Sequence, residues 1–194
     1  MTGVQTCALP IYLTETWRRT LDSNLVVGVL FIDFQKAFDS ISHKILTYKL
    51  EHNYGIKGNL LAWTRDYLSK RKQYTVVNGE LSDQAYVTSG VPQGSVLGPT
   101  LFALYTGDLP EAVSSTSLYM CADDTTIYCI GESVDSVTNT LNNALKELED
   151  WSSKNNLVPH PKKCEAMMLL RGRFTGPLKA LTLCNHTIKC THDY

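Results

Sequence analysis

The chain has 194 residues, 43% of them hydrophobic, and a formal net charge of −1. This length and apolar content suit one folded domain with a sizeable core. The near-neutral charge gives no overall attraction to nucleic acid or membranes, and no apolar run reaches membrane-spanning length. No signal peptide is evident, and the six cysteines form no CxxC pair. We therefore expect an intracellular protein with reduced thiols that is not secreted.

The first eleven residues, MTGVQTCALPI, have no periodicity, no helix cap and no charge. They are similar to the conceptual translation of a sequencing-library adapter. We therefore predict that residues 1–11 are an artefact without a structural role. An ordinary flexible N-terminus is the alternative, and only the nucleotide sequence separates the two.

The first half of the chain predicts one strand, two helices and a hairpin. Residues 25–33 are a short apolar run rich in valine, as in a strand buried on both faces. Apolar residues then recur at helical spacing over 41–50, and Asp39 is a good N-cap for that helix. A second helix is expected across 59–72. Asn78-Gly79 between alternating residues predicts a β-hairpin.

The second half predicts a helix, a strand pair, a long helix and a final strand. Residues 90–98 carry glycine and proline, and an apolar helix follows to about 108. Residues 118–130 are typical of two short strands that meet at an Asp-Asp pair. An amphipathic helix is expected over 133–151 and a strand over 165–170. This order predicts an α+β fold, with one sheet and helices packed on one face.

Three carboxylates are candidate site residues because each lies where a strongly apolar strand ends. Asp123 and Asp124 are adjacent between two such strands, and Asp33 ends another. An Asp-Asp pair alone is usually a solvated turn. Strand ends that are neighbours in a sheet, however, would bring all three acids together, and their repulsion favours a bound hard cation such as Mg²⁺. A buried pair that shares one proton remains the alternative.

Three motifs in order carry a family resemblance: FIDFQKAFDSISH, GVPQGSVLGPTLF and CADDTTIY. They resemble successive palm motifs of the reverse transcriptases of non-LTR retrotransposons, and the resemblance runs from Leu25 to the end. It implies a polymerase palm, with an antiparallel sheet and the catalytic acids at strand ends. On this pattern, 12–24 is the remnant of a preceding fingers region, 25–170 is the palm core, and 171–194 is the truncated start of the segment leading to the thumb.

The resemblance also implies a set of metal ligands. Asp33 and Asp123 would be the principal ligands, the backbone carbonyl of Phe34 would add another, and Asp124 would complete the acidic cluster. Two Mg²⁺ ions are implied, with Mn²⁺ as their substitute.

Four further residues would contact substrates by the same resemblance. Phe38 would be the gate that excludes a ribonucleotide 2′-OH, although its residue type alone favours a core aromatic. Gln93 and Gly94 would lie against the nascent base pair and template, although GVPQGS also suits a plain turn before a helix. Lys163 would lie near the triphosphate, although single lysines are usually solvated.

The implied activity is RNA-directed DNA synthesis from dNTPs, a DNA primer and an RNA template, in the cytoplasm and nucleus. The fingers, thumb and any endonuclease region would lie outside this chain, so we expect it to be inactive alone. The basic stretches SKRK and RGRF are short enough to be ordinary solvated surface. A non-enzymatic, decayed remnant is the alternative. An RNA-templated RNA polymerase is disfavoured because Phe38 would crowd a ribose hydroxyl.

Overall fold

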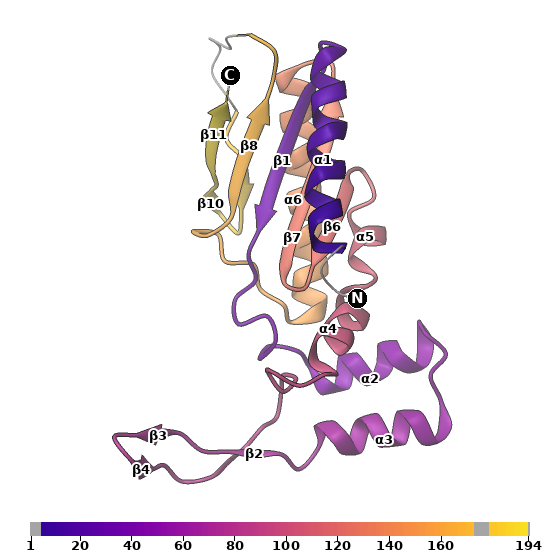
Figure 1. Cartoon of the computed structure of the whole chain (residues 1–194), viewed down its shortest axis with the longest axis vertical. Helices are drawn as coiled ribbons and strands as arrows, with labels where there is room; N and C mark the ends of the chain where they lie inside the picture. The colour runs from indigo at the N-terminus through magenta and orange to yellow at the C-terminus, as the bar shows by residue number, and fades with distance from the viewer. Residues whose placement is uncertain (1–4, 173–178, 194) are drawn as a thin grey trace. The chain divides into compact units, whose positions relative to one another are not determined.

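The computed structural model describes residues 5–172 and 179–193, which divide into two compact units (Figure 1). The sheet unit comprises the described residues of Met1–Asp33, Pro110–Trp151 and Pro159–Tyr194. The arm unit comprises Phe34–Leu109 and Ser152–Val158. The short helix α5, Leu109–Ala112, begins in the arm unit and continues into the sheet unit.

A five-stranded sheet forms the centre of the sheet unit, in the order β11-β8-β1-β7-β6. The β1 strand pairs antiparallel with both β7 and β8, β6 pairs antiparallel with β7, and β11 lies parallel to β8 at the edge. A separate two-stranded hairpin is made by β9 and β10. The strands are β1 (Val26–Ile32), β6 (Ser117–Cys121), β7 (Asp124–Gly131), β8 (Glu165–Leu169), β9 (Thr182–Leu183), β10 (His186–Thr187) and β11 (Lys189–Asp193).

The long helix α6 (Val134–Asn155) covers one face of the sheet. It can approach closely because residue 28 of β1 is glycine. A Cβ atom there would lie 2.8 Å from Leu141 Cδ1, closer than carbon atoms pack. The apolar stripe predicted over 133–151 is thus the face that α6 buries, and its leucines 141, 145 and 148 are fully buried.

A second helix, α1 (Gln5–Asp22), covers the opposite face of the sheet. Leu13 and Trp17 of α1 join a buried cluster with Val27 and Val29 of β1 and Tyr128 of β7. The prediction that the helices pack on one face is therefore wrong. Since neighbouring residues of β1 point to opposite faces and almost all are buried, each face needs a cover.

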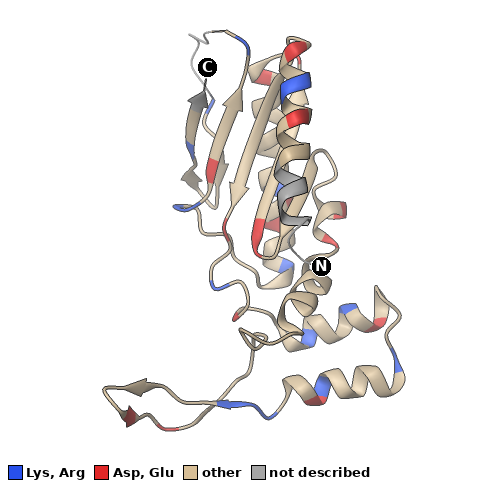
Figure 2. Ribbon diagram, viewed as in Figure 1, with Lys and Arg blue, Asp and Glu red and all other residues tan. Residues whose placement is uncertain are grey.

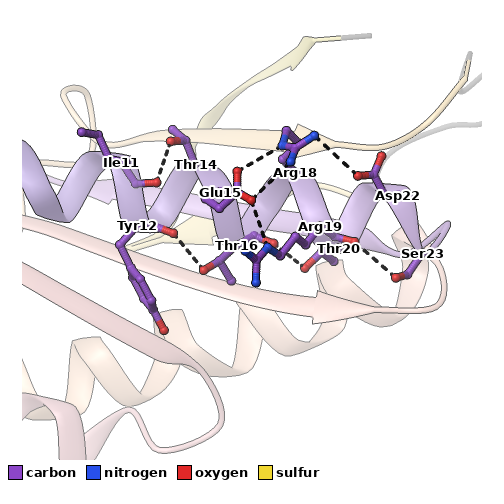
Figure 3. Close-up of polar contacts among 10 residues, drawn as sticks. All are labelled: Ile11, Tyr12, Thr14, Glu15, Thr16, Arg18, Arg19, Thr20, Asp22 and Ser23. Carbon is purple, nitrogen blue, oxygen red and sulfur yellow. Dashed lines mark hydrogen bonds and ion pairs between the residues drawn. The ribbon is translucent and has the colours of Figure 1, made fainter.

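Polar side chains of α1 bond to one another and to the backbone of the helix (Figure 3). Glu15 accepts hydrogen bonds from the guanidinium groups of Arg18 and Arg19. The hydrogen bond from Arg18, which has the larger effect, and the one from Arg19 hold the pKa of the Glu15 carboxyl below its usual range. The helix begins at Gln5, inside the segment predicted to be an artefact, and the origin of that segment stays a prediction.

The arm unit contains the helices α2, α3 and α4. Two short strand pairs lie between α3 and α4 in the chain. The β3–β4 pair turns at Asn78 and Gly79, whose φ angles are +52° and +85°, as a type I′ turn requires. The predicted hairpin is thus confirmed. The elements are α2 (His43–His52), α3 (Gly58–Leu68), β2 (Lys72–Gln73), β3 (Val76–Val77), β4 (Glu80–Leu81), β5 (Ala85–Tyr86) and α4 (Gly98–Thr106).

Two polar groups fix the ends of α2. Ser42, and not Asp39 as predicted, is the N-cap, because its hydroxyl accepts the backbone N–H of Ile45. Near the other end, the buried Lys49 ammonium donates to the Tyr105 carbonyl at 2.6 Å and to Asp108 at 2.7 Å. Burial lowers the pKa of Lys49, and the Asp108 carboxylate opposes that shift. This ion pair ties α2 to the chain at and after α4.

None of the described helices combines the length and the apolar character that crossing a bilayer would need.

Candidate active site

Asp33 and Asp124 line one cavity at the end of the β1–β7 pair. Ile32 of β1 is paired with Thr125 of β7, so Asp33 and Asp124 occupy the next position on the two strands. Both line a cavity of about 500 Å³. Its other walls are Phe31, Ile32, Thr125, Thr126 and Lys163. The structure thus brings together two of the three predicted acids and the predicted lysine.

Asp123 occupies a different position, in the two-residue turn between β6 and β7. Cys121 and Asp124 are paired, so Ala122 and Asp123 form the turn itself. Ala122 has a φ of +56°, which a turn of type II′ requires at its first central residue and which favours glycine. Asp123 is exposed and is not among the residues that line the cavity. The tight turn therefore separates two adjacent acids, one at the tip and one at the cavity.

The Asp33 carboxylate has one oxygen that lacks a hydrogen bond. Its Oδ2 is buried and has no hydrogen-bond partner among the described residues. The Lys163 ammonium lies 3.6 Å away, an ion pair longer than a hydrogen bond. The Thr125 hydroxyl, which lines the same cavity, is also buried without a described partner. Buried oxygens are nearly always bonded, so two unbonded ones at one cavity suit a bound cation or ordered water.

A turn after α6 carries Lys163 to this cavity. The backbone N–H of His160 donates to the Asp33 carbonyl at 2.7 Å. The N–H groups of Lys163 and Cys164 both donate back to the His160 carbonyl, at 2.9 and 3.1 Å. These bonds fix the lysine backbone one turn away from Asp33. Sequence reasoning missed the part played by His160, and the proline after it was the only local signal of a turn.

The Cys164 thiol belongs to the same turn but does not line the cavity. It is buried, and burial raises the pKa of the thiol above its usual value. Cys129 on β7 is similar, with burial raising its pKa to about 11. Since the thiolate is the form that binds metals, the carboxylates are the better ligands here.

The donor set fits a hard cation that keeps other ligands. Among the side chains that the structure describes, no three of His, Cys, Asp or Glu are grouped closely enough to hold a metal ion by themselves. The three-carboxylate cluster predicted from the sequence is therefore not assembled. Two carboxylates at one cavity are nevertheless the number that Mg²⁺ takes from a protein when substrate phosphates supply the rest.

The remaining predicted site residues belong to the arm unit. Phe34 is buried there, and Phe38 is half-buried and stacked on Phe102 with ring centroids 4.8 Å apart. Gln93 donates its amide to the Asp39 carboxylate at 3.2 Å, and both line a polar cavity of about 600 Å³. The predicted site residues thus form two sets, each described within its own unit.

Backbone contacts hold the first two sequence motifs together in the arm unit. The Val91 N–H donates to the Phe38 carbonyl at 2.9 Å, and the Gly90 N–H donates to Ile41 at 2.7 Å. Gly90 has a φ of +87°, and a Cβ atom there would lie 2.8 Å from Asp39 Cα. Gly94 also has a positive φ, +75°, but its added Cβ would meet open space. Only Gly90 is therefore required for the close approach of the motifs.

With both sets of residues located, the class of protein is clear from the family comparison. Residues 9–189 match the model of the family "Reverse transcriptase (RNA-dependent DNA polymerase)". The chain belongs to this family, and the predicted resemblance is confirmed.

The curated relatives narrow the class to reverse transcriptases of non-LTR mobile elements. The RNA-directed DNA polymerase from mobile element jockey of Drosophila funebris is 28% identical over 184 residues. The protein of the same name from Drosophila melanogaster is 30% identical over 141 residues. These alignments include 90% and 69% of this chain but only 19% and 15% of the relatives, so the chain spans about a fifth of their length or less.

Solved structures show the same fold at low identity. Telomerase from Candida tropicalis superposes with a TM-score of 0.59 and 14% identity, covering 98% of this chain and 39% of that one. Telomerase from Candida albicans gives 0.58 and 13%, covering 85% and 32%. At this identity the likeness speaks for the fold alone, an α+β fold with a sheet rich in antiparallel pairs.

We predict that Gly90→Ala will destabilise the chain more than Gly94→Ala. Both substitutions place a side chain at positive φ, which costs about 1 kcal/mol. Only Gly90→Ala also forces a Cβ against the Asp39 backbone, so we expect a further loss of about 1–3 kcal/mol. Urea denaturation of both variants measures the difference in the free energy of unfolding, and equal losses would contradict the described packing.

Proposed function

We propose that this chain is the palm portion of an RNA-directed DNA polymerase that joins dNTPs to a primer 3′-OH on an RNA template. The observation that carries the proposal is the cavity where Asp33 and Asp124 meet at the ends of two paired strands. Family membership supports the reaction class, and the buried, unbonded Oδ2 of Asp33 supports a cation as the missing partner.

Asp33 and Asp124 would hold Mg²⁺ at this cavity, whereas Asp123 and the Phe34 carbonyl, the further ligands predicted from the sequence, do not line it. When bound, a pair of such ions supplies positive charge at the attacking and the leaving oxygens of a phosphoryl transfer. The two carboxylates bind and orient by charge, and Asp33 is held in place by the bond from His160 to its backbone. The exposure of Asp123 leaves its carboxylate accessible from solvent.

Lys163 would present a second cation on the same cavity wall. In the free chain its ammonium lies beside Asp33 and partly neutralises that carboxylate. An incoming triphosphate offers it a stronger anionic partner, so the lysine would turn from the acid to the phosphate. This exchange fits a position whose side chain is largely exposed and whose backbone is fixed.

The predicted contacts to the sugar and the bases are residues of the arm unit and are described within it. Phe38 would exclude the 2′-OH, and its stack on Phe102 limits the rotation of its ring. Gln93 would face the nascent pair, with its amide oriented by the Asp39 carboxylate. Gly94, which has open space around it, would let a template backbone come close. The RNA template and DNA primer would be held further by fingers and thumb regions, so the 194-residue chain alone would be inactive or nearly so.

We predict that the chain binds Mn²⁺ and that Asp33→Asn weakens this binding at least tenfold. The substitution removes the charge of a carboxylate whose buried oxygen lacks a hydrogen bond. Loss of the free-ion signal in electron paramagnetic resonance measures the affinity, and Mg²⁺ should compete. Asp22→Asn is the matched control, since Asp22 is an exposed acid on α1 outside the cavity.

Equal affinity in the wild type and both variants would contradict a cation site at the cavity. The same result would favour the alternative, a non-enzymatic remnant whose acidic residues bind no metal ion.

We predict opposite effects of Lys163→Gln on two ligands. Removing the ammonium 3.6 Å from Asp33 should strengthen Mn²⁺ binding by a few fold, because one competing positive charge is lost. It should weaken binding of a dNTP, because the triphosphate loses a partner. Lys162→Gln, an exposed neighbour, should change neither affinity. Isothermal titration calorimetry measures the affinities for Mn²⁺ and for the dNTP. A change of both affinities in the same direction would refute the proposal that Lys163 moves from Asp33 to the triphosphate.

A further inference from the structure

A strip of aromatic and basic side chains, exposed except for the half-buried Tyr67, runs from α3 onto β2 and β5 in the arm unit. On α3, the rings of Trp63 and Tyr67 are stacked, with centroids 5.7 Å apart and planes 18° from parallel. The Arg71 guanidinium lies over the Tyr67 ring, 5.3 Å from its centroid, at the distance of a cation–π contact. Positions 63, 67 and 71 are four residues apart, the spacing that keeps the first two on one helix face.

The next residue continues the strip on the strand pair. Lys72 on β2 is paired with Tyr86 on β5, and its ammonium lies 5.0 Å from the centre of the Tyr86 ring. Tyr86 is among the most exposed large side chains of the described residues, and more than half of Trp63 is also exposed. We refer to Trp63, Tyr67, Arg71, Lys72 and Tyr86 as the aromatic–basic strip.

The charge of the strip differs from that of the chain as a whole. Four basic residues and one acid lie between positions 65 and 72, a net charge of +3 in a chain of net charge −1. Figure 2 shows this basic character over β2 and the segment before it. Arg65 is paired with Glu51 at 3.3 Å, whereas Arg71 and Lys72 lie beside neutral rings. The charges of these two residues are therefore available to an anionic partner.

Flat rings interleaved with cations are the chemistry that binds single-stranded nucleic acid. Each base has a face that can stack on an aromatic ring, and the phosphates between bases attract lysine and arginine. A folded protein partner would be met better by a continuous apolar patch with few charges at its centre. In the strip the cations lie on the rings themselves, so charge complementarity selects a polyanion with flat groups.

We propose that the aromatic–basic strip binds single-stranded nucleic acid, stacking bases on Trp63 and Tyr86 and pairing phosphates with Arg71 and Lys72. The strip leads to the proposed base-pair contacts, because Arg71, Lys72 and Tyr86 line the same cavity as Gln93. The inference thus deepens the proposed function and rests on it for the role of the strand as template. The binding itself needs neither a metal ion nor catalysis.

The test measures binding of fluorescein-labelled 12-nucleotide RNA and DNA of one sequence to the full 194-residue chain by fluorescence anisotropy, in EDTA. We expect Trp63→Ala and Tyr86→Ala each to weaken binding about tenfold, since stacking of one base contributes about that much. Replacing Arg71 and Lys72 together by Ala should reduce the slope of log K against log salt by about 1.4. Tyr48→Ala is the matched control, an exposed ring on α2 stacked on His52 and outside the strip.

Tryptophan fluorescence gives an independent reading of the same contact. Of the three tryptophans, Trp63 is 52% exposed, whereas Trp17 and Trp151 are 9% and 5% exposed. Quenching by acrylamide therefore reports mainly on Trp63, and a bound oligonucleotide should protect it. Circular dichroism of each variant confirms that the fold is retained.

Three results would overturn the inference: no binding by the wild-type chain, equal affinity in the strip variants, or the same loss in Tyr48→Ala. Tighter binding of RNA than DNA would identify the natural strand as RNA, and equal binding would leave the strip as a general single-strand site. Asp33→Asn should bind the oligonucleotides as the wild type does. Failure of the cation site and failure of the strip are thus separate outcomes.

Discussion

The antiparallel register between β1 and β7 determines where the acidic groups of this protein lie. Ile32 opposite Thr125 places Asp33 and Asp124 side by side beyond the last pair. A slip of one residue would turn every side chain of one strand to the other face, burying exposed groups and exposing the core. The register is therefore held by burial on both faces, through α6 at Gly28 and α1 at Trp17, and the packing of the whole sheet unit fixes the positions of two carboxylates.

Placing two like charges at one cavity opposes folding unless another group compensates for their repulsion. In the free chain the Lys163 ammonium is the compensating charge, and the His160 turn holds its backbone in place. The compensation is incomplete, because the ion pair with Lys163 is longer than a hydrogen bond and neither Asp33 Oδ2 nor the Thr125 hydroxyl has a hydrogen-bond partner among the described residues. An arrangement that would be a defect in a purely structural sheet is appropriate for a site that takes a cation and then a charged substrate.

Much of this fold could be predicted from the sequence because its strongest patterns are local. The valine-rich strand at 25–33, the Asn78-Gly79 turn and the stripe of α6 each follow from periodicity or turn chemistry. The cover on the second face, made by Leu13 and Trp17 of α1, was missed because residues 12–24 were assigned to the remnant of a preceding fingers region and were not predicted to be a helix of this fold. Ser42 and Asp39 are both good N-caps three residues apart, so local preference could not choose between them. Asp123 and Asp124 lie at different places because the turn between β6 and β7 has two residues, a length that the sequence does not determine. Arg71 contacts Tyr67 of the preceding helix and Lys72 contacts Tyr86 of the paired strand, and a short basic run does not reveal either contact.

We propose that the cavity lined by Asp33 and Asp124 is a divalent-cation site. X-ray diffraction from crystals of the chain grown with Mn²⁺, recorded near the manganese absorption edge, locates the ion directly by its anomalous signal. We predict a peak within coordination distance of both carboxylates, with the Lys163 ammonium displaced from Asp33. A well-ordered map with Asp33 still paired to Lys163 and no peak at the cavity would contradict it.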